Sequence, residues 1–278
     1  QTFRPSPGEY DSFFYENGFL VYKTMDSVKY VFSRVLTNNM GLLEKIVDTN
    51  GNATLFSYST VRDVPLLTLI ADPSGRNVQL SYGSADDDLK WDKILQLRET
   101  VNSAAPRIVD YEYNGNGDLV HVKENRSYAG ATDFIDRYFT YDGNSRMLTY
   151  TDPRDTILYN EYDAEGRVIK QYEFNPDKDA VGQKRLVYEL VYEGSNAGAP
   201  GSTHCTFVKN YRDAANFYSE RVCFNLSELK IYRQDGEGNV QRWTYDGSGL
   251  VATYTDQNGS ITQYQYDSKR RKILEILP

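Results

Sequence analysis

Residue types that could carry chemistry are sparse in this sequence. His121 and His204 are its two histidines and stand far apart, so two unrelated strand residues are favoured over a shared metal site. The sequence contains no serine or cysteine nucleophile elbow, no glycine loop that could cradle a phosphate and no zinc-type spacing of cysteine and histidine. Aspartate and glutamate total 39 residues, which leaves room for a pair of catalytic carboxylates of the glycosidase type. We nevertheless expect no enzymatic activity, metal or cofactor, because turns account for most of the prominent aspartates.

One group of oxygen-bearing side chains resembles the start of a calcium loop. Asp48, Asn50 and Asn52 alternate as the first ligands of such a loop do. The glycine comes at the fourth position instead of the sixth, and no glutamate follows at the twelfth, so the segment is not an EF-hand. Loosely bound surface calcium is kept as a minor alternative to a simple turn.

The two cysteines fall in a segment whose strand register can be read from the sequence. If residues 212–216 form a five-residue loop, Tyr211 pairs with Phe217. In an antiparallel pair, the residue numbers of opposed residues have a constant sum. The register that pairs Tyr211 with Phe217 therefore also places Cys205 opposite Cys223. Opposed residues of an antiparallel pair have Cβ atoms about 4.5–5.5 Å apart, close to what a disulfide needs. Two interpretations stay open, a structural disulfide and a pair of packed thiols.

The role of the aromatic residues can be interpreted in two ways. The chain has 24 tyrosines and 2 tryptophans, and tyrosine suits a pleated surface that is half buried. In the structural interpretation, which regular spacing favours, rings of neighbouring repeats such as Tyr58 and Tyr82 stack across strands. In the functional interpretation, exposed rings on one face of a sheet bind glycans, with Trp91 and Trp243 as candidate contacts.

The elements that position these residues are set by a repeated turn. Asp at the first position of an Asp-x-x-Gly turn can bond the backbone two residues on, and Gly at the fourth can adopt positive φ with a bulge. Between the turns lie six or seven residues, the length of one short strand. Tyrosine follows the aspartate at a fixed offset of ten. This register is shared by Asp48 with Gly51 and Tyr58, Asp72 with Gly75 and Tyr82, Asp235 with Gly238 and Tyr245, and Asp256 with Gly259 and Tyr266.

A weaker copy of the repeat lies in the middle of the chain. Asp152 keeps Tyr162 at the right offset but has Asp155 where the glycine is expected, so it is a degenerate copy. Tyr141 precedes Tyr162 by 21 residues, which is one period of the repeat. Gly166 ends the turn that follows Tyr162. A turn every ten or eleven residues with a strand between is typical of an antiparallel meander.

Composition narrows the function classes. The chain has 278 residues and a net charge of −8, and its acidic balance argues against a nucleic-acid partner. No apolar run approaches the roughly 18 residues of a membrane span. We therefore expect an acidic β-rich protein without a membrane span.

The most telling copies of the repeat are Tyr245-Asp-Gly-Ser-Gly-Leu-Val, Tyr162-Asp-Ala-Glu-Gly-Arg-Val and Asp72-Pro-Ser-Gly-Arg. On these residues, the repeat resembles the YD repeat of the Rhs (rearrangement hotspot) family over about residues 14–277, with an interruption at 175–228. In that family, which includes polymorphic bacterial toxins, the B and C components of Tc toxins and teneurins, such repeats build a spiralling sheet that closes into a hollow shell. The resemblance implies a shell that encapsulates a toxic C-terminal domain or serves adhesion.

These observations predict an all-β fold, a repetitive antiparallel hairpin meander that forms a curved or spiralling YD-repeat sheet, part of a shell. We expect a single repeat domain over 1–278, with an irregular lead-in at 1–12, repeat blocks at 13–174 and 229–278, and an insertion with a hairpin at 175–228. The predicted role is a non-enzymatic scaffold of a secreted or cell-surface toxin or adhesin, whose partner is the rest of the parent polypeptide or its toxin cargo. The alternative is a carbohydrate-binding module that contacts cell-surface glycan.

Overall fold

The computed structural model describes residues 12–33, 41–101, 105–128, 131–195 and 199–278. Every regular element within these ranges is a β-strand, and every strand pair described is antiparallel, which confirms the predicted all-β meander. No helix long and apolar enough to cross a membrane occurs in the described part of the chain. The predicted lead-in at 1–12 lies outside the described residues except for Ser12, which begins the first strand.

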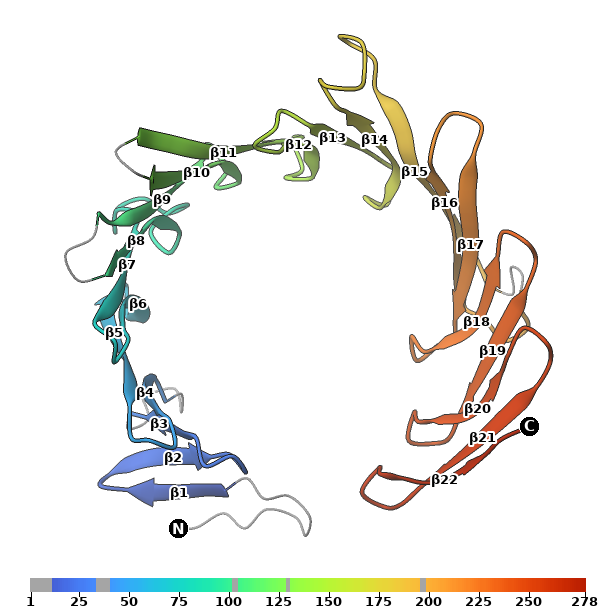
Figure 1. Cartoon of the computed structure of the whole chain (residues 1–278), viewed down its shortest axis with the longest axis horizontal. Helices are drawn as coiled ribbons and strands as arrows, with labels where there is room; N and C mark the ends of the chain where they lie inside the picture. Colours follow the sequence, from blue (N-terminus) through green and yellow to red (C-terminus); the bar gives the residue numbers. More distant parts are fainter. Residues whose placement is uncertain (1–11, 34–40, 102–104, 129–130, 196–198) are drawn as a thin grey trace. The chain divides into compact units, whose positions relative to one another are not determined.

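The chain divides into two compact units, Gln1–Phe139 and Thr140–Pro278 (Figure 1). In the first unit, each strand pairs with the next wherever the pairing is described. Its strands are β1 (Ser12–Glu16), β2 (Phe19–Lys23), β3 (Lys29–Phe32), β4 (Leu43–Val47), β5 (Ala53–Val61), β6 (Val64–Ala71), β7 (Arg76–Tyr82), β8 (Ile94–Val101), β9 (Arg107–Tyr113), β10 (Leu119–Tyr128) and β11 (Ala131–Tyr141), whose last two residues enter the second unit.

The second unit continues the same pattern. Its strands are β12 (Met147–Thr151), β13 (Ile157–Tyr162), β14 (Val168–Phe174), β15 (Arg185–Glu193), β16 (His204–Tyr211), β17 (Phe217–Phe224), β18 (Lys230–Asp235), β19 (Val240–Tyr245), β20 (Val251–Thr255), β21 (Ile261–Tyr266) and β22 (Lys272–Ile276). Each pairs with the next along the chain. Residues 175–228, expected as an insertion, thus supply three further strands of the meander.

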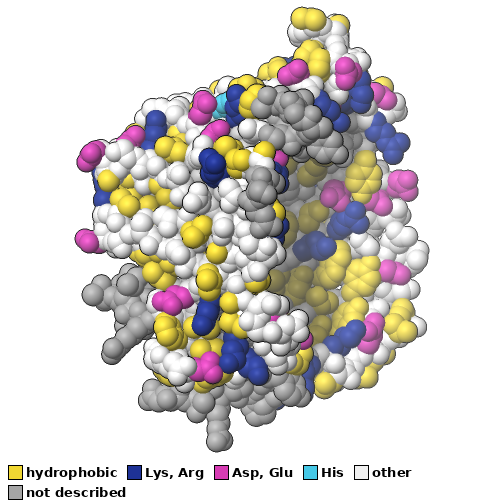
Figure 2. Space-filling view, turned by 60° about the vertical axis from the view of Figure 1, so that its left-hand side comes forward, with side chains coloured by type: hydrophobic (Ala, Val, Ile, Leu, Met, Phe, Trp, Pro, Cys, Tyr) yellow, Lys and Arg dark blue, Asp and Glu magenta, His cyan; other side chains and the backbone are white. Residues whose placement is uncertain are grey.

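In both units the sheet is a single layer and buries few side chains. The buried hydrophobic residues described in the first unit are Val21, Val31 and Leu66. Hydrophobic side chains lie among charged ones of both signs over the surface turned toward the viewer in Figure 2. A sheet without a second layer has little apolar area to remove from water. Its cohesion therefore depends on strand pairing and on the hydrogen bonds at the strand ends.

β-Bulges recur beside the strand-end tyrosines. In the β5–β6 pair the register shifts at Tyr58, which leaves Thr68 as the extra residue on β6. The same shift lies beside Tyr82, Tyr162, Tyr245 and Tyr266. A bulge interrupts the regular hydrogen-bond ladder and strengthens the local twist. The strand ends of this protein therefore contain backbone groups that need partners outside the ladder.

Candidate functional site

The prominent aspartates close the turns. The Oδ1 atom of Asp48 accepts the N–H groups of Asn50 and Asn52, each at 2.8 Å, and Oδ2 accepts the amide group of Asn52 at 2.8 Å. The Gly51 N–H donates to the Asp48 carbonyl at 3.1 Å. The hydrogen bond from the Asn52 side chain, followed by those from the backbone, holds the pKa of Asp48 below its usual value. This geometry explains the alternating oxygen-bearing side chains without a metal ion.

The backbone pattern of this turn recurs along both units. The first residue donates its N–H to the carbonyl of the fifth and accepts the N–H of the fourth, which has positive φ. The degenerate copy at Asp152 keeps the turn, with Asp155 in the left-handed region at φ 59°. The turns begin at Thr24, Asp48, Asp72, Asn114, Asp142, Asp152, Asp163, Asn225, Asp235, Asp246, Asp256 and Asp267.

Tyrosine hydroxyl groups bond the carbonyls beside the bulges. Tyr245 on β19 donates to the carbonyl oxygen of Lys230 at 2.6 Å, and Lys230 directly precedes Ile231, the extra residue in the β17–β18 pair. We call this contact the tyrosine clasp, because it joins a strand to the bulged end of the strand before it. The other clasps are Tyr58 to Leu43, Tyr82 to Leu67, Tyr113 to Ile94, Tyr162 to Met147 and Tyr192 to Val168.

The clasp corrects one prediction about the tyrosines. Tyr58 and Tyr82 were expected to stack, but β6 lies between their strands, and neighbouring strands are about 4.8 Å apart. Their ring pair is absent among the described residues, and so is that of Tyr245 and Tyr266. Their burial raises the pKa of Tyr58, Tyr82 and Tyr245, as expected for hydroxyl groups turned into the sheet.

The two candidate glycan contacts are half buried and lie in different units. In the first unit, the guanidinium of Arg62 lies 5.5 Å from the centre of the Trp91 ring. In the second, the Lys230 ammonium lies 4.0 Å from the centre of the Trp243 ring, and the Tyr254 ring lies 5.4 Å away on the other neighbouring strand. Both indoles thus pack against side chains of the protein. Glycan binding by either residue stays a prediction.

The histidines also have local partners. His121 Nε2 lies 2.7 Å from Asp136 Oδ1, its Nδ1 lies 3.3 Å from Glu112, and its ring stacks on Tyr138 at 4.4 Å. His204 lies in the second unit beside Glu228 and Phe224. No group of three or more metal-ligating side chains with suitable geometry occurs in the described ranges.

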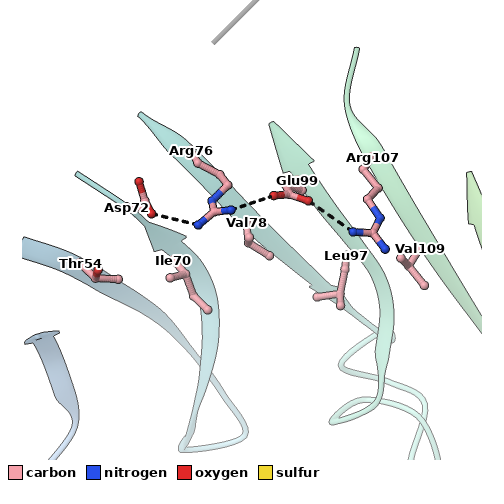
Figure 3. Close-up of a pocket in the computed structure, with 9 residues that line it drawn as sticks. All are labelled: Thr54, Ile70, Asp72, Arg76, Val78, Leu97, Glu99, Arg107 and Val109. Atoms are coloured by element: carbon pink, nitrogen blue, oxygen red, sulfur yellow. Dashed lines mark hydrogen bonds and ion pairs between the residues drawn. The ribbon is translucent and has the colours of Figure 1, made fainter. Parts of the chain in front are cut away.

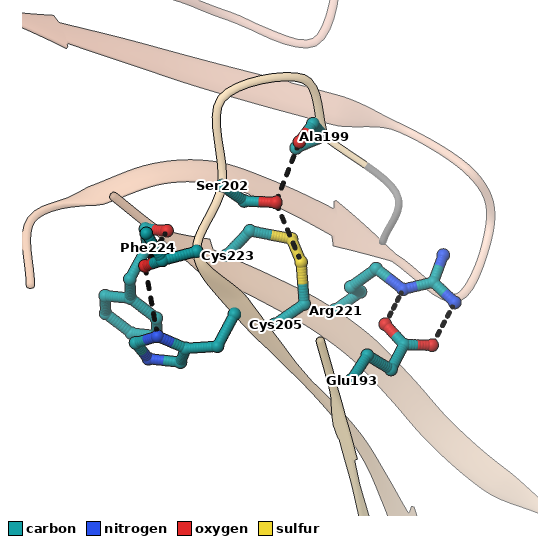
Figure 4. The surroundings of a disulfide bond; sticks show 9 residues. Glu193, Ala199, Ser202, Cys205, Arg221, Cys223 and Phe224 are labelled. Carbon is teal, nitrogen blue, oxygen red and sulfur yellow. Dashed lines mark hydrogen bonds and ion pairs between the residues drawn. A yellow bond between two sulfur atoms is a disulfide. The ribbon is translucent and has the colours of Figure 1, made fainter. Parts of the chain in front are cut away.

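The cysteines lie opposite one another in the register derived from the sequence. Tyr211 pairs with Phe217 and Cys205 with Cys223, and a disulfide joins the two cysteines. Both are almost fully buried, beneath the turn in which Ser202 Oγ donates to the Ala199 carbonyl at 2.8 Å (Figure 4). Tyr232 packs in the same cluster. These two cysteines have the lowest exposure among the described residues of the second unit.

The first unit contains a groove of about 580 Å³ that crosses β5 to β9. Its floor is apolar, formed by Ile70, Val78, Leu97 and Val109, and a row of charged side chains runs along one side (Figure 3). Its apolar lining and its length across several strands suit an extended apolar segment better than a compact polar ligand.

The charged row alternates in sign from strand to strand. Arg76 lies 3.2 Å from Asp72 and 3.8 Å from Glu99, which in turn lies 4.0 Å from Arg107. Arg107 continues the row to the buried Glu124 at 2.5 Å. The opposite charges neutralise each other, so the row holds neighbouring strands together instead of attracting a ligand of one sign.

Sequence reasoning missed this row. Glu99 lies on β8, and the long segment 83–93 separates β8 from β7, so the position of Glu99 relative to Arg76 cannot be counted from a short turn. The available signal was opposite charge at the ends of successive strands. That signal becomes specific only when the pairing of β7 with β8 and of β8 with β9 is known.

The turns, bulges and tyrosine clasps define a YD-repeat sheet. No protein-family model matches the chain. The chain is 24% identical over 223 residues to the probable deoxyribonuclease RhsB of Dickeya dadantii (strain 3937). That alignment covers 72% of this chain and 14% of RhsB, so the chain spans a small part of the relative's length. The similarity confirms the resemblance to the Rhs family that the motifs predicted.

Solved structures that contain TcdB2-TccC3 are also similar to the chain. In the crystal structure of TcdB2-TccC3-Cdc42 the match covers 95% of this chain and 18% of that chain, with 13% identity and a TM-score of 0.39. In the crystal structure of TcdB2-TccC3 it covers 89% of this chain and 17% of that chain, with 14% identity and a TM-score of 0.27.

Proposed function

We propose that the chain is a non-enzymatic segment of the YD-repeat scaffold of a larger toxin-type protein. In this proposal its sheet forms part of a wall around the rest of the polypeptide or its toxin cargo. The similarity to RhsB, over only 14% of that protein, supports a segment of a larger repeat protein. The deoxyribonuclease activity in the name of RhsB belongs to that whole protein, and the proposal does not assign it to this segment.

The tyrosine clasp is the observation that carries the proposal. Six tyrosines donate to carbonyls beside strand ends, and the turn carboxylates and asparagines are occupied by backbone N–H groups. The turn residues therefore close their own turns, and the clasp tyrosines join each strand to the strand before it. A side chain that serves a single reaction has no reason to recur in successive repeats, whereas a scaffold can use the same bond at many hairpins.

The disulfide supports a secreted or cell-surface location for the parent protein. Disulfides persist in oxidising compartments and are rare in the reducing cytosol. Cys205 and Cys223 are buried and bonded in the second unit. We therefore place the working form of the parent protein in an oxidising environment.

Protection of the cargo from protease tests the proposal in the parent polypeptide. The wild-type parent is compared with a triple variant, Tyr82→Phe, Tyr162→Phe and Tyr245→Phe, which removes three clasps. We expect trypsin to cut the enclosed segment slowly in the wild type and at least several-fold faster in the triple variant, as mapped by mass spectrometry. Tyr266→Phe is the matched control, because Tyr266 has the same repeat position but its hydroxyl forms no clasp to Val251 within the described residues.

Equal and rapid cutting of the cargo in both proteins would overturn the encapsulation role. A purified segment 1–278 that hydrolyses DNA or a glycoside would overturn the non-enzymatic role separately.

A further inference from the structure

The second unit contains a pocket of about 560 Å³. Three turns line it, formed by residues 199–201 before β16, residues 225–229 between β17 and β18, and residues 246–249 between β19 and β20. Tyr232 of β18 and Arg242 of β19 line it from the sheet. Concave sites of this volume, with apolar walls and a few polar groups, are typical of pockets that bind small molecules. The pocket is therefore a candidate ligand site.

The wall formed by residues 199–201 is anchored on the disulfide. The N–H and the hydroxyl of Ser202 both donate to the Ala199 carbonyl, at 3.2 and 2.8 Å, and the hydroxyl oxygen lies 3.7 Å from Cys205 Sγ (Figure 4). Tyr232, which lines the pocket from the sheet, packs in the same buried cluster as both cysteines. A covalent bond thus fixes the cluster against which the wall and the tyrosine pack, and this part of the pocket is formed before a ligand enters.

The guanidinium of Arg242 has an aromatic neighbour but no acidic partner in the described part of the chain. It lies 5.4 Å from the centre of the Tyr232 ring, and the residues opposed to Arg242 on the neighbouring strands are Tyr232 and Thr255. Arg221 on β17 shows the contrast, because its Nε lies 2.8 Å from the carboxylate of Glu193. The fork of N–H donors of Arg242 is therefore left to pair with a carboxylate from outside the chain.

We propose that this pocket binds a small organic carboxylate with an apolar body. Arg242 would hold the carboxylate through two parallel hydrogen bonds, and the apolar part of the lining would contact the body. That apolar part includes Ala199, Pro200, Leu229 and Ile231. Asp246 also lines the pocket, and its Oδ1 accepts the N–H groups of Ser248 and Leu250 at 2.8 and 3.0 Å. Its negative charge disfavours a dianion such as phosphate. The proposal goes beyond the scaffold role and does not depend on it.

Phenylacetate is the probe for this site, and phenylacetamide, which has the same body without the charge, is the matched control ligand. Binding to the whole chain is measured by ligand-observed NMR titration. We expect saturable binding of phenylacetate and binding about five-fold weaker or less for phenylacetamide. Arg242→Gln should weaken the binding of phenylacetate by about the same factor, since charge-assisted hydrogen bonds are lost. Arg212→Gln should bind as the wild type does, because Arg212 is also exposed but lies on the β16–β17 turn, outside the pocket lining.

Three results would overturn the proposal. The first is absence of saturable binding of phenylacetate to the wild-type chain. The second is equal affinity of the wild type and Arg242→Gln, or of the wild type for phenylacetate and phenylacetamide, because either result removes the guanidinium from the site. The third is tighter binding of inorganic phosphate than of phenylacetate. None of these results bears on the protection of the cargo from protease, so the scaffold role is tested separately.

Discussion

The hydroxyl group of Tyr245 lies 2.6 Å from the carbonyl oxygen of Lys230, fifteen residues earlier in the chain. The β-bulge at Ile231 disturbs the ladder next to this carbonyl, and the tyrosine of the following strand supplies a hydrogen bond there. The bulge and the tyrosine thus act together: the bulge disturbs the backbone pairing, and the tyrosine hydroxyl bonds the carbonyl beside it. The repetition of this arrangement gives a reason for the tyrosine that follows Asp48, Asp72, Asp152 and Asp235 at the same offset.

Removal of one clasp should lower the stability of the second unit. We expect Tyr245→Phe to reduce the free energy of unfolding by about 1–2 kcal/mol, because the hydrogen bond is lost and the Lys230 carbonyl is left without it. Urea unfolding followed by Trp243 fluorescence, in a background with Trp91→Phe, measures this change. Tyr266→Phe should cost less than half as much. Equal losses for the two variants would show that the ring, and not the clasp, carries the effect.

Replacement of Asp155, a non-glycine residue at the fourth position of its turn, by glycine should raise the stability of the protein. Asp155 has φ 59°, a conformation that costs an L-residue more than glycine. We expect Asp155→Gly to stabilise the second unit by about 0.5–1 kcal/mol in thermal and urea unfolding. Asp155→Ala is the matched control, since it removes the carboxylate but keeps the Cβ atom, and it should not stabilise. If alanine stabilised the protein as much as glycine, the gain would come from removal of the negative charge and not from relief of the backbone strain.

The turn aspartates should make stability depend on acid pH. The Asn239 side chain first, and then backbone N–H groups, lower the pKa of Asp235 below 3.8. Because the folded pKa lies below the unfolded value, this group stabilises the fold above about pH 4, and the contribution is lost as the pH falls through the folded pKa.

Asp235→Asn should flatten this dependence. Asn114 and Asn225 already begin turns of the same geometry, so the amide oxygen can accept the same N–H groups. Urea unfolding between pH 7 and pH 2.5 should therefore show a smaller loss of stability in the variant. An unchanged pH dependence would mean that the acid sensitivity comes from other carboxylates.

Loss of the disulfide should destabilise the β16–β17 hairpin. The two cysteines are 18 residues apart, and cross-linking a loop of this size restricts the unfolded chain by about 3 kcal/mol. We expect the double variant Cys205→Ala, Cys223→Ala and the reduced wild type to lose similar stability. Mass spectrometry of the non-reduced protein provides the direct check, and free thiols in the purified oxidised protein would contradict the disulfide.

A glycan array distinguishes the scaffold from a carbohydrate-binding module. Lys230 and Tyr254 pack against Trp243, so we expect no specific glycan binding by the wild-type chain. Trp243→Ala should instead lower stability by removing these contacts. Specific binding that is lost in Trp243→Ala or Trp91→Ala, with the fold retained, would favour the carbohydrate-binding alternative.

The sequence by itself determined the repeated turns and the pairing of Cys205 with Cys223. These features are local, because the side chain of Asp48 reaches only its own turn, and a hairpin register follows from the length of its loop. Even Asp152 makes its turn without glycine at the fourth position, because its side-chain oxygen accepts the backbone N–H groups of Arg154 and Thr156.

Only the tertiary structure decided which groups meet across strands. The partner of Tyr245 depends on a bulge in the preceding pair of strands, and a bulge shifts register by one residue without a clear signature in the sequence. The row from Asp72 to Glu124 depends on how β7 pairs with β8 and β8 with β9, and β7 and β8 are joined by the long segment 83–93, whose length does not fix a register. Contacts of this kind result from the stacking of hairpins, and so the sequence predicted the repeat but not the bonds that join one repeat to the next.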